Sequence, residues 1–293
     1  MKRMNMVERL VELIRETSSS LPEDVLKAIR SAMRRETRGK SAAVVLKTIL
    51  DNCALAKKQS TPLCQDTGTL AFYVDESLKR KVTPAVIKKA VAIATERGYL
   101  RKNCIDSVTG KSYDDNCCDG APVVHYVHEV KSEKCRVKSC GTVTLLLKGG
   151  GSENMSRQYS LPDASLGAGR DLEGVRKCIL DAVVKAQGFG CAPGILGVCI
   201  GGDRATAYEV AKEQLLRPLD ASEELRVKKE ELRKLEKRVL KEANELGIGP
   251  MGLGGRTTLL GVKIASRPRV PASFFVTVAY MCWACRRRTI VVK

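Results

Sequence analysis

The sequence predicts a mixed α/β fold of the α+β class, and two observations support this prediction. Residues 1–58 have the apolar spacing of amphipathic helices, whereas the rest of the chain mixes helix and strand patterns without the regular alternation of a doubly wound sheet. No internal repeat or low-complexity linker divides the 293 residues. We therefore expect one domain over residues 1–293, with residues 1–58 as a helical N-terminal segment.

Elements of the first half follow from apolar spacing and from turn residues. Thr83 and Pro84 form a typical N-cap and first helical position, which predicts a helix that begins there. Runs of β-branched and aromatic residues predict strands. In chain order, the expected elements are helices at 7–16, 24–36 and 41–58, a strand at 70–74, a helix at 83–100, and strands at 123–130 and 142–150.

The second half contains the same mixture of patterns. Acidic and basic residues alternate at i,i+3 and i,i+4 spacing over residues 227–247, which is typical of the solvated side of an exposed helix. In chain order, the expected elements are a helix at 172–190, a strand at 195–203, a helix at 205–219, the charged helix, and strands at 257–265 and 272–281.

Composition and charge narrow the function classes. The net charge is +18, but acidic and basic side chains alternate in the charged helix, aromatic residues make up only 4% of the chain, and no nucleic-acid-binding motif is found. We therefore expect no nucleic-acid partner, and we interpret the charge as attraction for a small polyanionic substrate or as an ion-pair-rich surface. Neither a run of about 20 apolar residues nor a signal-peptide pattern is present, which predicts a cytoplasmic protein.

The twelve cysteines require a choice among disulfides, metal ligands and core packing. Without an export signal, the thiols should stay mostly reduced. Zinc is disfavoured, because only residues 282–285 have CxxC spacing and the chain has just two histidines, His125 and His128. Cys117 and Cys118 are interpreted as loop thiols. The commoner role of a small buried hydrophobe is assigned to Cys53, Cys135, Cys140, Cys178 and Cys199.

Four loops combine glycine with reactive side chains, at residues 62–68, 147–154, 188–203 and 249–255. Glycine lets a ligand approach main-chain N–H groups closely, which suits anion and cofactor sites. None of the four has the spacing of a dinucleotide-binding or phosphate-binding loop. Each of them, taken alone, is also consistent with an ordinary turn.

Three cysteines, Cys64, Cys191 and Cys282, lie where the backbone is expected to leave regular structure. Thiolates in such positions can converge on an iron–sulfur cluster, which most often takes four cysteines. A cluster held by three would leave one iron without a protein thiolate, and that iron could act as a Lewis acid on a substrate oxygen. The residues themselves therefore raise the hypothesis of an open iron–sulfur site.

Seven motifs occur together in one order along the chain. They are PLCQDTG at 62–68, YLRKN at 99–103, LKGGGSEN at 147–154, GCAPGILGVCIGG at 190–202, LLRPL at 215–219, IGPMGLGG at 248–255 and PASFFVTVAYMCWACRR at 271–287. With these motifs the chain resembles, over nearly its full length, the α subunit of the iron–sulfur hydro-lyases, the family of class I fumarate hydratase and L-tartrate dehydratase. The resemblance implies the N-terminal-domain fold of class I fumarases, with helices and strands intermixed around a cluster site.

The resemblance also implies a cofactor and its ligands. It implies a [4Fe-4S] cluster held by Cys64, Cys191 and Cys282, whose fourth iron binds the hydroxyl and a carboxylate of a 2-hydroxy dicarboxylic acid. Gln65 and Asp66 would then lie beside the cluster, where they bind substrate and transfer a proton. The alternative for Asp66 is a carboxylate that only caps a turn.

Further substrate contacts follow from the same resemblance. Arg101 matches an arginine that binds a substrate carboxylate, a role suited to its planar guanidinium. The backbone N–H groups of Gly149, Gly150 and Gly151 would complete the anion site. Cys285 has CxxC spacing with a ligand but is not expected to be one.

The chain departs from the family pattern in two places. Family members often have a histidine in an RHPAS-like segment, whereas this chain has Val270 within SRPRVPAS, so we expect this substrate contact either to be missing or to be supplied by Arg267 or Arg269. The residues that follow TIVVK in single-chain fumarases are absent. We therefore expect a separate β subunit of the same hydro-lyase, which completes the active site in an α–β hetero-oligomer.

The function implied by the resemblance is that of the α subunit of a [4Fe-4S]-dependent hydro-lyase, which reversibly hydrates fumarate to malate. The alternative is L-tartrate dehydratase, which converts tartrate to oxaloacetate. It stays open because malate and tartrate differ by only one hydroxyl. A non-enzymatic basic protein, either a nucleic-acid binder or an iron–sulfur scaffold, is the candidate from another class.

Overall fold

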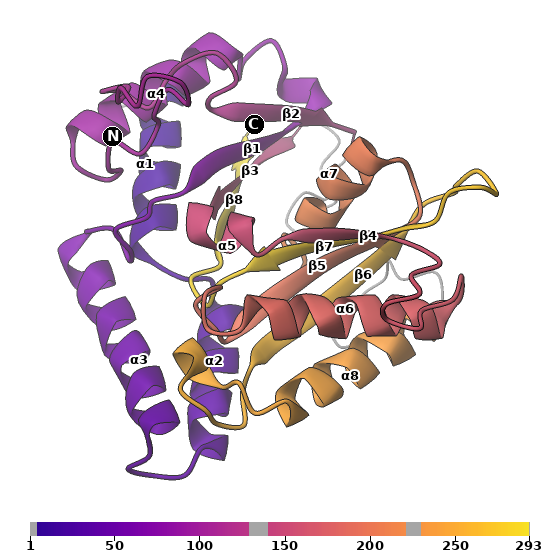
Figure 1. Cartoon of the computed structure of the whole chain (residues 1–293). Coiled ribbons are helices and arrows are strands. Elements are labelled where there is room, and N and C mark those ends of the chain that lie inside the picture. Colours follow the sequence, from indigo (N-terminus) through magenta and orange to yellow (C-terminus); the bar gives the residue numbers. More distant parts are fainter. Residues whose placement is uncertain (1–4, 129–139, 221–229, 293) are drawn as a thin grey trace. The chain divides into compact units, whose positions relative to one another are not determined.

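The computed structural model describes residues 5–128, 140–220 and 230–292, and these residues form two compact units (Figure 1). The first unit takes the described residues of Met1–Pro22, Asp51–Gly150 and Arg286–Lys293. The second unit takes those of Glu23–Leu50 and Gly151–Cys285. Each unit has its own four-stranded sheet and its own apolar core.

The sheet of the first unit has the strand order β2-β1-β3-β8 (Figure 1). Its strands are β1 (Thr69–Asp75), β2 (Val123–Val127), β3 (Gly141–Lys148) and β8 (Arg286–Val292). β1 is parallel to β2 and antiparallel to β3, which is in turn antiparallel to β8. Because of this register, the start of β1, the end of β3 and the start of β8 share one edge of the sheet.

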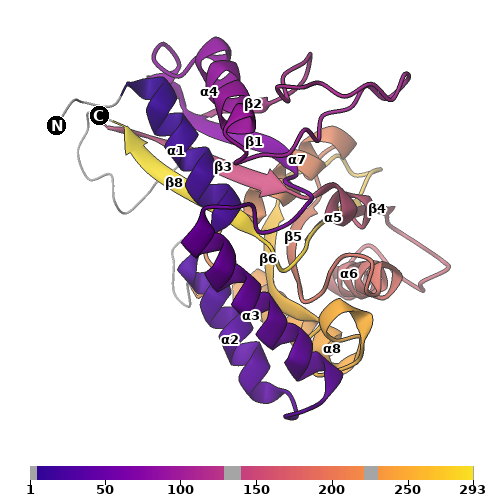
Figure 2. The same ribbon diagram turned by 90° about the vertical axis from the view of Figure 1, so that its left-hand side faces the viewer.

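Two helices cover one face of this sheet, α1 (Met6–Ser19) and α4 (Pro84–Glu96) (Figure 2). A short 3₁₀ turn, η1 (Glu76–Leu78), follows β1. The side chain of Asn5 caps α1 by accepting from the Glu8 N–H at 2.9 Å, and Thr83 caps α4 as predicted. The core takes alternate residues of each strand, including Leu70, Phe72, Val74, Val143, Leu145 and Leu147. Burying each large apolar side chain stabilises the unit by about 1.5–3 kcal/mol.

The sheet of the second unit has the strand order β4-β7-β5-β6 (Figure 1). Its strands are β4 (Arg157–Ser160), β5 (Gly194–Ile200), β6 (Leu259–Ser266) and β7 (Phe275–Met281). β5 is parallel to β6 and antiparallel to β7, and its residue Ile195 pairs with Met281. The loop that enters β5 and the loop that leaves β7 therefore lie at the same edge.

Helices lie on both faces of this second sheet. α6 (Leu172–Ala186) and α8 (Glu230–Glu245) share a core with Leu196, Val198 and Ile200 of β5. α7 (Arg204–Gln214) packs on the opposite face, where a Cβ at Gly197 would lie 2.1 Å from the carbonyl oxygen of Ala211. The other elements are α2 (Glu23–Arg35), α5 (Gly150–Asn154), η2 (Pro250–Gly252) and α3 (Ser41–Gln59), which begins in the second unit and ends in the first.

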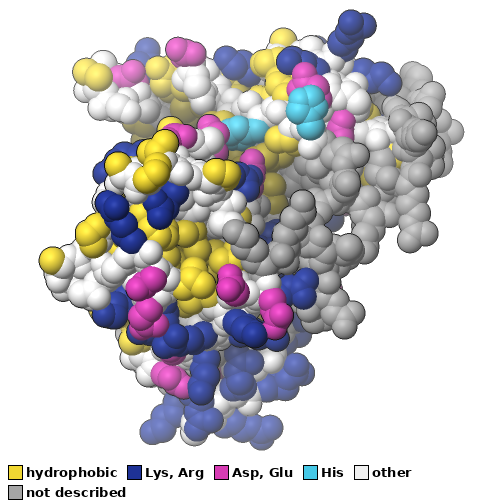
Figure 3. Space-filling view, turned by 90° about the vertical axis from the view of Figure 1, so that its right-hand side faces the viewer, with side chains coloured by type: hydrophobic (Ala, Val, Ile, Leu, Met, Phe, Trp, Pro, Cys, Tyr) yellow, Lys and Arg dark blue, Asp and Glu magenta, His cyan; other side chains and the backbone are white. Residues whose placement is uncertain are grey.

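The charged helix is confirmed over Glu230–Glu245, the part of residues 227–247 that the structure describes. Leu232, Leu235 and Val239 face the core, and the exposed side carries i,i+4 ion pairs such as Arg238–Glu242 at 2.9 Å. On the face shown in Figure 3, acidic side chains lie among the Lys and Arg side chains. Exposed pairs of this kind contribute little to stability. No helix in the described part of the chain is both long and apolar enough to cross a membrane.

The α+β class is confirmed, although several element boundaries differ from the predictions. The helix expected to run to residue 100 ends at Glu96, because Gly98 takes a positive φ of 74° that a helix does not accommodate. The strand expected at 123–130 is described as far as Val127, and residues 129 and 130 lie outside the described part. Residues 286–292 form β8, an element that the strand patterns did not predict.

Candidate functional site

The CQDTG turn leads into β1 at the edge where β3 ends and β8 begins. Gly68 takes φ +82°, and a Cβ at this position would lie 2.7 Å from the backbone carbonyl of Lys148. Any other residue would therefore suffer both backbone strain and a steric clash. Glycine at 68 thus fixes the turn against the LKGGGSEN loop, which comes from a distant part of the sequence.

The carboxylate of Asp66 lies over the glycines of that loop. Its Oδ2 is 3.0 Å from the position that a Cβ would take at Gly149, and 3.8 Å from the corresponding position at Gly150. On the other side, the amide Nδ2 of Asn103 lies 3.5 Å from Oδ1. The structure therefore brings together three of the predicted site residues, and it adds Asn103, which the sequence analysis had not singled out.

Arg101 lies beside the same turn. Its backbone N–H donates to Thr67 Oγ1 at 3.3 Å, and its Nη1 lies 3.5 Å from the carbonyl oxygen of Gln65. The residue is exposed, so most of its guanidinium donors face solvent. A guanidinium in this state can bind a carboxylate through two parallel hydrogen bonds. The five predicted substrate-site residues, Gln65, Asp66, Arg101, Gly149 and Gly150, thus form one group in the first unit.

The position of Arg101 depends on Asn116, a residue that the sequence analysis did not identify. Asn116 is 3% exposed, and its side chain makes four hydrogen bonds. Oδ1 accepts from the N–H groups of Asn103 (2.8 Å) and Cys104 (3.0 Å), while Nδ2 donates to the carbonyl of Arg101 (2.7 Å) and to Thr95 Oγ1 (3.0 Å). Asn116 also has φ +59°, which asparagine tolerates better than most residues. That preference was the available signal, since Asn116 lies in the turn-forming stretch DDNCCDG.

We expect Asn116→Ala to release the segment that carries Arg101. The variant loses four hydrogen bonds, so the free energy of unfolding should fall by about 1–3 kcal/mol, and amide hydrogen exchange at Asn103 and Cys104 should accelerate. Asn116→Asp is the matched control, because it keeps the acceptor for these two amides and loses only the donor. Unchanged exchange in Asn116→Ala would contradict this role.

A third residue that the sequence patterns do not single out is Arg286, the first residue of β8. It is 1% exposed, and its Nη2 donates to the backbone carbonyl of Asp66 at 2.9 Å. Among the described residues, no hydrogen-bond acceptor is found for its Nε and Nη1. A buried cation of this kind destabilises the fold unless an anionic group lies near it. The Asp66 carboxylate is such a group, because a Cβ at Gly149 would lie 3.0 Å from Asp66 Oδ2 and 3.8 Å from Arg286 Nη2. Arg286 therefore holds the turn that carries Asp66.

In the second unit, Cys191 and Cys282 lie next to each other. Cys191 precedes β5 and Cys282 follows β7, and the N–H of Trp283 donates to the carbonyl of Cys191 at 3.3 Å. The ring of Tyr280 packs against the backbone on both sides of Cys191, at Gly190 and Gly194. Burial raises the pKa of Tyr280, and the negative charges of the Cys282 and Cys191 thiolates raise it further. Both thiols are thus near the same buried ring.

The backbone around Cys191 is shaped by close contacts. Cys191 itself takes φ +52°, an unusual conformation for a residue other than glycine. A Cβ at Gly190 or Gly194 would lie 2.3 or 2.5 Å from atoms of Tyr280. The N–H of Met251, from the IGPMGLGG loop, donates to the carbonyl of Ala192 at 2.8 Å. Three of the seven motifs therefore meet within the second unit.

The donor set suits an iron–sulfur cluster in its chemistry. Cys64, Cys191 and Cys282 are partly exposed and lie outside any disulfide, whereas Cys285 is 1% exposed. Cysteine thiolates are the usual ligands of such clusters. One of the three thiols belongs to the first unit and two to the second. Within the described ranges, no group of three or more His, Cys, Asp or Glu side chains is arranged to hold a metal ion.

The remaining cysteines mostly follow the predictions. Cys53, Cys178 and Cys199 are buried, as expected for small core residues. The prediction is wrong for Cys140, which is disulfide-bonded and partly exposed just before β3, outside the apolar core. Cys135 lies outside the described residues.

The loop with Val270 does not provide an obvious replacement for the family histidine. Val270 is 65% exposed. The Nη1 of Arg269 donates to three carbonyl groups of its own loop, at 3.0–3.2 Å, and its guanidinium lies 4.4 Å from the ring centre of Phe274. Arg269 therefore stabilises the loop itself, and Nη1 of Arg267 donates to the adjacent carbonyl of Ser266, at 3.3 Å.

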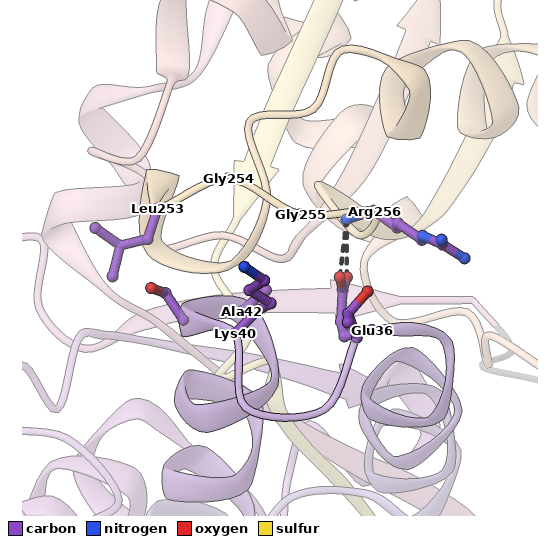
Figure 4. Close-up of a pocket in the computed structure, with 9 residues that line it drawn as sticks. Glu36, Lys40, Ala42, Leu253, Gly254, Gly255 and Arg256 are labelled. Carbon is purple, nitrogen blue, oxygen red and sulfur yellow. Dashed lines mark hydrogen bonds between the residues drawn. The ribbon is translucent and has the colours of Figure 1, made fainter.

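The lining of a pocket of about 340 Å³ in the second unit contains none of the predicted site residues (Figure 4). The pocket is bounded by the turn between α2 and α3 and by the loop after η2. The N–H of Arg256 donates to both carboxylate oxygens of Glu36, at 2.9 and 3.0 Å, and a Cβ at Gly255 would lie 2.7 Å from the Cβ of Ala42. Since Glu36 is already bound by the backbone, the pocket is best explained as a space left where the IGPMGLGG loop packs against the turn between α2 and α3.

The fold and these two groups of residues define a class of protein: an α+β protein that presents thiols, a carboxylate and a guanidinium on loops at sheet edges. Residues 7–291 match the model of the fumarate hydratase (Fumerase) family. The chain therefore belongs to the fumarate hydratase family.

Relatives in this family carry two kinds of name. A Geobacillus stearothermophilus protein, provisionally named a fumarate hydratase class I, is 49% identical over 285 residues, which are 96% of this chain and 53% of that protein. A Methanocaldococcus jannaschii protein, provisionally named L(+)-tartrate dehydratase subunit alpha, is 32% identical over 97% of this chain and 96% of its own length. The L(+)-tartrate dehydratase subunit alpha of Escherichia coli K12 is 27% identical over 98% of this chain and 91% of its own length. The chain thus spans about half the length of the Geobacillus relative and nearly all of the two alpha subunits.

Proposed function

We propose that this chain is the α subunit of a [4Fe-4S]-dependent hydro-lyase, which reversibly hydrates fumarate to malate. The observation that carries this proposal is the convergence, in the first unit, of the Asp66 carboxylate, the Arg101 guanidinium and the backbone of Gly149. A dicarboxylate needs a cation for its carboxylates, and its dehydration needs a group that accepts a proton from carbon. The group in the first unit supplies both.

Each residue then has a chemical role. Arg101 binds one carboxylate of the substrate through its two parallel N–H groups, and the N–H groups of Gly149 and Gly150 bind a neighbouring oxygen. Asp66 transfers the proton at the carbon next to the hydroxyl-bearing carbon, and Gln65 donates a hydrogen bond that orients the substrate. Arg286 and Asn103 hold Asp66 in position.

Cys64, Cys191 and Cys282 would hold the cluster. When bound, the cluster supplies Lewis-acid activation of the substrate hydroxyl. The adjacency of Cys191 and Cys282, together with the absence of disulfides at all three cysteines, supports this ligand set.

We further propose that a separate β subunit completes the enzyme. Two relatives that this chain matches over nearly their full length are named alpha subunits, and the Geobacillus relative is about twice as long as the matched region. The same names make L-tartrate the second candidate substrate. The identity of 49% to the relative named a fumarate hydratase favours fumarate.

The test is anaerobic coexpression of this chain with a β subunit from the same organism, followed by assays on fumarate, malate and both tartrates. We expect hydration of fumarate by the complex and none by this chain alone. Preference for L-tartrate would instead support the second candidate. Fumarate hydration by this chain alone, free of β subunit by mass spectrometry, would contradict the two-chain proposal.

In that complex, Arg101→Lys should weaken substrate binding. Lysine keeps the charge but loses the paired donors, so the loss should be about 1.5–3 kcal/mol, which corresponds to a KM raised about 10- to 150-fold. Arg97→Lys is the matched control, because Arg97 is an exposed arginine nearby that pairs with Glu8 at 3.2 Å. An unchanged KM in Arg101→Lys would exclude Arg101 from the carboxylate site.

A further inference from the structure

Two thiols outside the proposed ligand set lie in contact within the first unit. Cys104 Sγ and Cys118 Sγ are 3.3 Å apart, closer than the usual contact distance of two sulfur atoms that are not bonded. Both residues are partly exposed, and neither is in a disulfide. To form a disulfide, the two sulfur atoms would have to move only about 1 Å closer to each other.

The backbone at both cysteines is held by specific hydrogen bonds. The N–H of Cys104 donates to Asn116 Oδ1 at 3.0 Å, and its carbonyl accepts from Tyr113 N at 2.8 Å. The carbonyl of Cys118 accepts from Lys88 Nζ at 3.0 Å, and its N–H donates to the carbonyl of Ala121 at 3.1 Å. The backbone of the loop therefore holds the two cysteines at positions from which their sulfur atoms meet.

The adjacent Cys117 lies in a different environment. Its Sγ donates to the carbonyls of Lys88 and Asp115, both at 3.4 Å. Burial raises the pKa of Cys117 to about 11. Cys117 is thus a thiol adjacent in sequence to Cys118, but it is hydrogen-bonded to these two carbonyls and packs against the apolar core of the first unit.

We propose that Cys104 and Cys118 form a site of reversible oxidation, at which a hydroperoxide converts the two thiols into a disulfide. One thiolate attacks the O–O bond, which breaks to give a sulfenic acid and, with hydrogen peroxide, one water. The second thiol then attacks the sulfenic sulfur, the S–S bond forms, and a second water leaves. Each sulfur gives up one electron, both electrons reduce the peroxide, and a dithiol reductant reverses the change.

Burial, reinforced by the hydrogen bond with Cys118, raises the pKa of Cys104 to about 11. At neutral pH the Cys104 thiolate is therefore scarce, and its attack on the hydroperoxide should be slow compared with that of a low-pKa thiol. The disulfide would join the two segments that Asn116 already connects, next to Arg101.

The test uses the full chain, prepared without oxygen, treated with one equivalent of hydrogen peroxide and quenched with an alkylating reagent. Trypsin cleaves after Lys102 and Lys111, so Cys104 is released on a peptide separate from the one that carries Cys117 and Cys118. We expect a cross-link between these peptides that lacks two hydrogen masses and is absent after treatment with dithiothreitol. Cys118→Ser should reduce it at least about tenfold, while Cys117→Ser should leave it within about twofold of the wild type.

Three results would overturn the proposal. One is a cross-link that survives in Cys118→Ser and is lost in Cys117→Ser. Another is an intramolecular bond between Cys117 and Cys118 on a single peptide. The third is full alkylation of Cys104 after peroxide treatment. Because the measurement needs neither a β subunit nor a substrate, its failure is distinguishable from failure of the proposed function.

Discussion

Replacement of Cys282 by serine should abolish stable iron–sulfur loading of anaerobically prepared protein. A serine hydroxyl is a much poorer ligand for iron than a thiolate, and a cluster reduced to two protein thiolates should be lost. We expect about four irons per chain in the wild type and little in the variant. Cys64→Ser and Cys191→Ser should behave in the same way, and iron content and the visible absorption of the cluster are the measurements.

Cys285→Ser is the matched control for this experiment. Cys285 lies three residues after Cys282 and is of the same type, but it is 1% exposed and its thiol lies 4.0 Å from the carbonyl of Leu215. Iron content should therefore be retained in Cys285→Ser. Full iron loading in Cys282→Ser, or loss of iron in Cys285→Ser, would exclude the proposed ligand set.

Asp66→Asn should reduce the turnover of the α–β complex by about 10²- to 10⁴-fold, the usual contribution of a positioned acid or base. The substitution changes little volume and keeps the backbone carbonyl of residue 66 that Arg286 binds, so the turn should survive. Iron content and KM should change far less than kcat. Steady-state kinetics on fumarate and malate, combined with iron analysis, would establish this pattern.

Asp114→Asn controls for the loss of a negative charge from the first unit. Asp114 is exposed and pairs with Lys102 at 2.8 Å, so its removal should leave kcat almost unchanged. If Asp66→Asn keeps wild-type turnover, Asp66 is only a turn-capping carboxylate. If it loses iron as well, its role is structural.

The local part of the site could be predicted from sequence. Gly68 follows Cys64 and Asp66 within one short turn, and the need for a positive φ at that position follows from the turn itself. The convergence of this turn with Gly149 could not be predicted from local patterns, because it depends on the antiparallel register between β1 and β3. Register between distant strands is set by tertiary packing, which a single sequence does not display.

Arg286 and Asn116 could not be predicted as site residues for a different reason. Arg286 lies in the run RRRTIVV, which reads as charged and exposed, yet Arg286 is almost completely buried. Arginine is seldom buried without a partner, so its burial becomes understandable only when the Asp66 carbonyl is placed beside it. Asn116 likewise looks like any turn asparagine until its four hydrogen-bond partners are known.

The position of β8 has a consequence for synthesis on the ribosome. The first unit needs β8 as the partner of β3, and β8 begins after the last residue of the second unit. Residues 151–285 therefore leave the ribosome before the sheet of the first unit can be completed, although most of that sheet was translated earlier. Arg286 is translated with β8, so the Asp66 turn gains its buried support only after the second unit has been synthesised. The proposed substrate site is thus built from segments that are translated before and after the second unit, and the edge of β3 stays open to unwanted pairing until β8 is available.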